Sequence, residues 1–187
     1  MKAFFTFLLS AFSLLCIISC SSDDDTPPPP PPPAQEELIV GNWDMSSTTV
    51  EDGSASRSIQ GFPATFSFTG EGKNYDYQLS FTEDKELGEQ GSFTMVLTYS
   101  LLGQSIEQEI PVEVDDSGGL LLSGSYEIED SQLFVSKDNQ TVNATIDELT
   151  ETNLNLSIDL AELAPTLFNN EIQNVSGTIK MTFSRIE

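Results

Sequence analysis

The chain of 187 residues contains no histidine and only two cysteines. Histidine is the usual general base near neutral pH, and histidine and cysteine are the usual ligands of zinc, copper and haem iron. Cys16 lies in an apolar N-terminal stretch that we expect to be removed, which leaves Cys20 as the one mature cysteine. The sequence therefore predicts no disulfide, no metal site, no cofactor and no catalytic residue of the common kinds.

Basic residues are also scarce, since 7 Lys and Arg stand against 30 Asp and Glu, for a net charge of −23. A field of this sign repels phosphate backbones, so we expect no nucleic-acid partner. Such a charge usually indicates a well-solvated surface that repels other copies of the protein and resists aggregation. Attraction of cationic partners is the alternative. Acidic neighbours such as Asp115 and Asp116 follow from this composition, and their turns lack the spacing of a calcium loop. We predict that the protein is not an enzyme.

The chain has no apolar run long enough for a comfortable membrane span, which needs about 20 residues. The apolar stretch from Ala3 to Ile18 follows Lys2 and has the length of a signal-peptide core. It ends in Ile17-Ile18-Ser19-Cys20, which resembles the lipobox of bacterial lipoproteins. The resemblance implies that residues 1–19 are a lipoprotein signal peptide and that Cys20 carries the lipid that attaches the protein to a membrane. An ordinary secretory signal with a cysteine near its cleavage site is the alternative.

Residues 20–37 are predicted to form a tether, with Asp23 to Asp25 followed by an unbroken run from Pro27 to Pro33. Seven prolines in the polyproline II conformation make a stiff spacer of roughly 20 Å. A proline run can instead bind aromatic-lined grooves. The acidic cluster after the cysteine resembles the surface-export signal of lipoproteins in the Bacteroidota. That resemblance implies an outer-membrane lipoprotein displayed on the cell surface, with a periplasm-facing anchor as the alternative.

From Leu38 onward, apolar and polar residues alternate with a period of two, which predicts strands with one buried face. Such alternation favours antiparallel pairing over parallel pairing. The segment "LAELAPTLFNNE" is the one candidate helix, and Pro165 limits it to a turn or two. We expect turns at the breaks "TGEGKN", "TEDKELGEQG", "LLGQS", "DDSGG", "EDSQ" and "SKDNQT".

Two residues at the ends of this region suggest a particular barrel. Gly41-Asn42-Trp43 stands near its start, and Arg185 stands on the strand that closes the chain. The pair resembles the lipocalins, in which a Gly-x-Trp tryptophan packs at the closed end of the barrel against a basic residue of the last strand. The resemblance implies an all-β domain over residues 38–187, an antiparallel meander closed into a lipocalin-like barrel with one short helix before the last strand. An ordinary core position for Trp43 is the alternative.

Two functions from different classes remain open. In the first, the barrel binds a small apolar or amphipathic ligand. In the second, the interior is filled by its own side chains, and the outer surface acts as a non-enzymatic accessory or interaction module. The candidate lumen residues are large aromatic residues on the expected inward rows: Phe66, Phe68, Phe81, Phe93, Tyr99 and Phe183.

Overall fold

The computed structural model describes residues 34–59, 61–101, 104–114, 119–121, 123–168 and 172–186. The predicted signal peptide, the predicted lipidation site Cys20 and the proline run lie outside the described residues. The described part belongs to one compact unit, Pro33–Glu187. Its elements in chain order are α1 Gln35–Ile39, β1 Gly41–Ile59, β2 Phe62–Phe81, β3 Glu86–Leu101, β4 Gln104–Glu113, β5 Gly124–Glu129, β6 Gln132–Lys137, β7 Gln140–Leu149, β8 Asn153–Asp159, α2 Leu160–Leu167 and β9 Ile172–Arg185.

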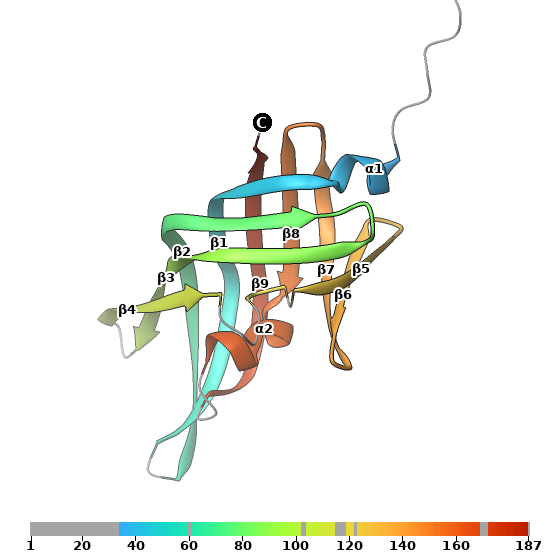
Figure 1. The fold of residues 1–187 in the computed structure, drawn as a ribbon. Helices are drawn as coiled ribbons and strands as arrows, with labels where there is room; N and C mark the ends of the chain where they lie inside the picture. The colour runs from blue at the N-terminus through green and yellow to red at the C-terminus, as the bar shows by residue number, and fades with distance from the viewer. Residues whose placement is uncertain are drawn as a thin grey trace, which may run out of the picture. The chain divides into compact units, whose positions relative to one another are not determined.

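All strand pairs are antiparallel, and eight of the strands form a closed hydrogen-bonded ring in the order β1-β2-β3-β5-β6-β7-β8-β9. β9 returns to pair with β1 along most of its length, which closes the ring. β4 pairs with β3 beside the ring (Figure 1). The prediction of an all-β antiparallel meander closed into a barrel, with one short helix before the last strand, is confirmed.

β1 and β2 are 19 and 20 residues long, which corrects the expected turn at "TGEGKN". Gly70 and Gly72 lie inside β2, where a bulge between Lys73 and Asp76 shifts the pairing with β3. A Cβ atom on Gly70 would lie 2.8 Å from Leu97 Cδ2, so this glycine permits close packing between strands and does not reverse the chain.

Of the other predicted turns, some are confirmed, one is shorter than expected, and others lie partly outside the described residues. Hairpin turns occur at Asp130-Ser131 and at Asp138-Asn139, all four with positive φ, as expected of two-residue turns that match the strand twist. The turn in "TEDKELGEQG" occupies only residues 82–85, because β3 begins at Glu86. The segments "LLGQS" and "DDSGG" lie partly outside the described residues.

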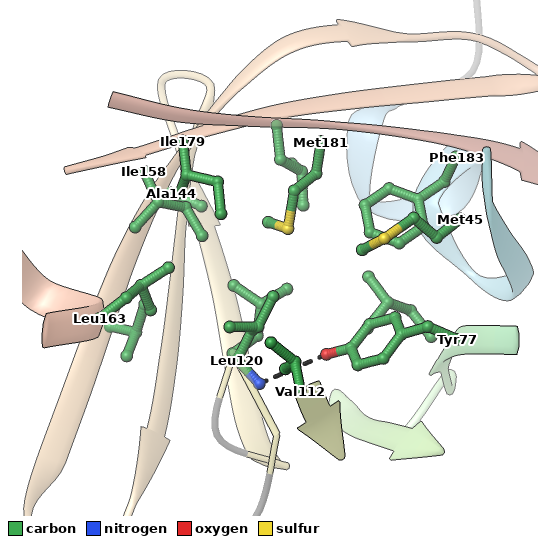
Figure 2. Close-up of a cluster of buried hydrophobic side chains, with 14 of the residues drawn as sticks. Met45, Tyr77, Val112, Leu120, Ala144, Ile158, Leu163, Ile179, Met181 and Phe183 are labelled. Atoms are coloured by element: carbon green, nitrogen blue, oxygen red, sulfur yellow. Dashed lines mark hydrogen bonds between the residues drawn. The ribbon is translucent and has the colours of Figure 1, made fainter. Parts of the chain in front are cut away.

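The interior of the barrel contains a continuous cluster of buried apolar side chains from nearly every strand and from α2. Figure 2 shows this packing, with Met45, Met181 and Phe183 facing Tyr77, and with Leu163 and Ile158 on the other side of Leu120. Close packing of this kind supplies most of the stabilisation of a disulfide-free domain.

α2 covers one end of the barrel, as the apolar positions in its sequence require. Leu160, Leu163 and Leu167 recur at helical spacing and are buried. The helix begins at Asp159, whose carboxylate accepts a hydrogen bond from the Ala161 N–H at 2.9 Å. Figure 1 shows α1 at the opposite end of the strands. None of the helices in the described ranges is long and apolar enough to cross a membrane.

Candidate functional site

The end of the barrel next to α1 is closed around Trp43. The Trp43 ring is fully buried, and its Nε1–H donates a hydrogen bond to the Ile39 carbonyl at 2.8 Å. The guanidinium carbon of Arg185 lies 4.2 Å from the centre of the ring, in a cation–π arrangement. Arg185 also donates to the carbonyl of Val40 at 2.6 Å and to that of Leu38. The structure thus brings together the two residues that the sequence pairs at the closed end.

Gly41 explains why a glycine stands two residues before this tryptophan. Its φ of +139° is a conformation that residues with a side chain rarely adopt. A Cβ atom at Gly41 would also collide with the Arg185 guanidinium. The Gly-x-Trp pattern therefore reflects both the backbone conformation and the position of Arg185.

Four of the six predicted lumen residues are buried in the packed core. Phe68, Phe81, Phe93 and Phe183 expose at most 3% of their surface. Phe81 packs edge-to-face on Tyr126 at a centroid distance of 5.1 Å. These four rings contribute to folding, and they do not offer a surface to a ligand from solvent.

The other two, Phe66 and Tyr99, are only partly buried and line a half-open pocket of about 200 Å³. The pocket lies at the α2 end of the barrel, because β9 begins there and its first residue, Ile172, is part of the wall. Among the described residues, the lining comes from five strands and includes Arg57, Ala64, Thr65, Phe66, Tyr99, Ile106, Gln108 and Ile172. We call this pocket the mouth pocket.

Aromatic rings form the wall and the floor of the mouth pocket. Phe66 and Tyr99 meet edge-to-face at a centroid distance of 5.5 Å. Below them Phe68 contacts Tyr99 at 5.9 Å and Phe168, at the end of α2, also at 5.9 Å. The T-shaped contacts keep the rings in defined orientations.

The mouth pocket also has polar groups at its edge. The Tyr99 hydroxyl donates a hydrogen bond to Gln108 Oε1 at 3.0 Å, and partial burial raises the pKa of that hydroxyl. Tyr99 therefore remains a neutral donor at physiological pH. The site combines apolar walls with a few placed hydrogen-bonding groups, as ligand pockets generally do.

Sequence reasoning identified Phe66 and Tyr99 but missed the rest of the mouth pocket. Ile106 lies on β4, beside the predicted break "LLGQS", and 47% of its surface is exposed. Arg57 and Ile172 face each other across the β1–β9 pair. No local sequence pattern could place these three residues together. Their proximity depends on the pairing of β1 with β9 and of β4 with β3.

A pair of polar side chains, one from β2 and one from β3, is buried away from the mouth pocket. The Tyr77 hydroxyl donates a hydrogen bond to Glu89 Oε2, which also accepts from the Leu121 N–H at 3.1 Å. The Leu120 N–H donates to the Tyr77 oxygen at 3.4 Å (Figure 2). Burial raises the pKa of the Glu89 carboxyl and that of the Tyr77 hydroxyl. We interpret the pair as an anchor that holds the backbone of residues 119–121 against the barrel.

Sequence reasoning missed Glu89 because it lies in "GEQG", a segment expected to be a turn. Its position on the strand was the available signal, since it lies two residues after Leu87 and four before Phe93, both of which point inward. Within the described residues no group of three His, Cys, Asp or Glu side chains is arranged to hold a metal ion.

Comparisons of this chain with protein-family models, with curated proteins and with solved structures gave no match.

Proposed function

We propose that this protein is an outer-membrane lipoprotein, anchored through Cys20 and displayed at the cell surface, whose barrel binds a small apolar or amphipathic ligand in the mouth pocket. The observation that carries the ligand-binding part is the half-open apolar pocket walled by Phe66, Tyr99 and Ile106. The anchor part is supported by the resemblance of Ile17-Ile18-Ser19-Cys20 to a lipobox. Two or more acyl chains at Cys20 would hold the protein stably at a membrane.

The size of the mouth pocket limits what it can hold. Pockets for drug-sized ligands measure about 300–1,000 Å³, whereas this pocket measures about 200 Å³. A small molecule, or one end of a longer apolar chain that projects into solvent, fits this volume. Burial of each methylene group would contribute about 0.8 kcal/mol, so a short chain can supply a measurable affinity.

The mouth pocket replaces the barrel interior as the proposed site. The inward rows of β2 and β3 are fully buried up to Phe68 and Leu97, and one step further along the same rows Phe66 and Tyr99 are only partly buried. A ligand can reach these two rings without displacing a core side chain.

Exposed apolar residues support the second candidate, an interaction module. Phe62, at the tip of the β1–β2 hairpin, exposes 76% of its surface, and Ile106 exposes 47%. A protein partner that covered Phe62 would not need to enter the mouth pocket, because Phe62 is not among its described lining residues.

Titration with 1-octanol, followed by calorimetry, tests the proposed site. The sample is the full chain with Cys20→Ala, so that no acyl group competes for the pocket. We expect Phe66→Ala to weaken octanol binding about tenfold, because the substitution removes apolar contact worth roughly 1–2 kcal/mol. Phe134→Ala is the matched control, since Phe134 is a partly buried phenylalanine on β6 that does not line the mouth pocket. Equal binding by the two variants, or no binding by the parent protein, would refute the mouth pocket as the ligand site.

A further inference from the structure

We propose that the outer edge of β4 binds an extended segment of a partner protein, which adds to the sheet as a further strand and carries lysine or arginine at alternate positions. The inference concerns the backbone edge of β4 and the outer face of the barrel, so it does not depend on a ligand in the mouth pocket. It goes beyond the function proposed above, because it assigns an interaction surface and the chemistry of the partner.

β4 has one paired edge and one open edge. Among the described strands, only β3 pairs with β4, so β4 is the last strand of the sheet (Figure 1). Its first six residues, Gln104 to Glu109, are all exposed. An edge strand with unpaired N–H and C=O groups can accept a further strand, and many proteins bind extended peptides in this way.

The register of β3 and β4 fixes which backbone groups face the open edge. The Val114 N–H donates to the Gly91 carbonyl at 3.1 Å, and the pairing continues along β4 without a shift. Because hydrogen-bonded and non-hydrogen-bonded pairs alternate in an antiparallel ladder, the even-numbered residues of β4 bond to β3. The N–H and C=O groups of the odd-numbered residues therefore point away from β3, and Ser105, Glu107 and Glu109 carry those of the exposed part.

Pro111 agrees with this assignment and limits the length of the open edge. It is an odd-numbered residue, so the N–H that proline lacks would have pointed away from β3. The next residue, Val112, is buried. A partner strand can therefore use the full backbone of residues 105–109, which gives room for a short extended segment.

The outer face beside the open edge is acidic. The odd-numbered residues of β4 share this face and include Glu107, Glu109 and Glu113. Glu107 and Glu71 of β2 line a groove of about 290 Å³ on the same face. Lys73 lies in this groove too, but its charge is balanced by Glu109 at 2.5 Å. Within the described residues neither Glu107 nor Glu71 forms an ion pair, so both can receive a cation from outside.

The two faces of β4 define the residues that a partner segment needs. In an added strand, the side chains on the outer face lie beside Glu107 and can reach the groove, so lysine or arginine there would gain an acidic neighbour. On the other face Ile106 exposes 47% of its surface, so an apolar residue between two basic ones would also find a contact. The expected partner segment thus alternates basic and apolar residues.

The charges also argue against a second copy of this chain as the occupant. Two β4 edges paired with each other would bring their glutamates together on one face, and like charges on adjacent strands are destabilising. A basic segment is instead attracted by the net charge of −23, which raises its rate of encounter with the protein.

Short peptides in which lysine alternates with valine test the inference. The lysine probe is acetyl-KVKVKVK-amide, and the acidic probe has glutamate in place of each lysine. Two further forms of the lysine probe carry N-methyl groups, one on every lysine nitrogen and the other on every valine nitrogen. All are titrated by calorimetry at pH 7.5 and 150 mM salt into the full chain with Cys20→Ala.

Two variants in the same background locate the contact. Glu107→Gln removes the free acid at the open edge. Glu129→Gln is the matched control, because Glu129 is exposed on β5, is not among the residues given for the groove, and its replacement changes the net charge equally. Circular dichroism of each variant shows whether it is folded.

We expect the lysine probe to bind and the acidic probe to show no binding. Glu107→Gln should weaken binding of the lysine probe about fivefold, the size of a favourable ion pair at a surface, while Glu129→Gln should change it less than twofold. In an added strand only alternate N–H groups point toward β4. One methylated probe should therefore retain binding and the other should lose it, and this comparison needs no variant of the protein.

Three results would overturn the inference. Failure of the lysine probe to bind, or equal binding of the acidic probe, would remove the basic partner. Equal behaviour of the two methylated probes, or equal losses in the two glutamine variants, would mean general attraction to an acidic surface without strand addition. Sedimentation of the protein alone completes the test, because a dimer that Ser105→Pro abolishes would assign the open edge to a second copy.

Discussion

Replacement of Trp43 by alanine is the most direct test of the closed end of the barrel. The indole is fully buried, donates its Nε1–H to the Ile39 carbonyl at 2.8 Å and lies under the Arg185 guanidinium at 4.2 Å. The variant loses the burial of a large ring, leaves a carbonyl without its donor and removes the aromatic partner of a cation. All three losses act at one place in the fold.

The magnitude follows from these losses. Truncation of a buried tryptophan costs about 3–5 kcal/mol of unfolding free energy. The hydrogen bond contributes about 1 kcal/mol and the cation–π contact about 0.5–2 kcal/mol, both within that total because the contributions overlap. We therefore expect Trp43→Ala to lower the free energy of unfolding by about 3–5 kcal/mol, a large part of the stability of an ordinary domain.

Urea unfolding followed by far-ultraviolet circular dichroism is the appropriate assay. Trp43 is the only tryptophan in the chain, so its fluorescence is lost in the variant. Trp43→Phe is the matched control, which keeps an aromatic ring under Arg185 but removes the N–H donor, and it should lose about 1–2 kcal/mol. A loss under about 1 kcal/mol for Trp43→Ala, the size of an ordinary surface substitution, would show that the ring does not close the barrel.

Three further predictions address other parts of the molecule. Burial raises the pKa of the Glu89 carboxyl in the folded state, so the folded protein binds a proton there more readily than the unfolded chain does. The contribution of Glu89 to the free energy of unfolding therefore falls as the pH rises through the raised pKa. Urea unfolding from pH 4 to 7 should therefore show a shallower loss of stability with rising pH for Glu89→Gln than for the parent, and parallel curves would contradict this reasoning. Gly41→Ala should lose more stability than Gly61→Ala in the same assay, because both glycines have positive φ but only Gly41 faces a side chain, that of Arg185; equal losses would mean that backbone strain alone explains the glycine. Cys20→Ala should abolish the incorporation of labelled fatty acid in cells, and labelling that persists would disprove the proposed anchor.

The strand pattern of this protein could be predicted from its sequence because each barrel strand has one solvent-exposed face and one buried face. Leu154, Leu156 and Ile158 are all buried, as their alternation with polar residues indicates. The hairpin at Asp138-Asn139 could also be predicted, since these residue types tolerate positive φ.

The prediction failed where a residue type has more than one physical use. Gly70 was expected in a turn, yet it lies inside a strand because its neighbours across the sheet leave no room for a side chain. Glu89 was not singled out, because its partner Tyr77 and the backbone N–H of Leu121 approach it only in the folded barrel.

The sequence by itself determined the strand-and-turn pattern of the domain and the absence of histidine, because these are properties of local periodicity and composition. Only the tertiary structure decided which aromatic residues pack in the core and which face solvent. Phe66 and Phe68 are two residues apart on the same face of β2, yet only Phe66 lines the mouth pocket. Phe168, at the end of α2, packs on Phe68 at a centroid distance of 5.9 Å and helps to cover it, and this contact depends on how the chain folds back over the barrel.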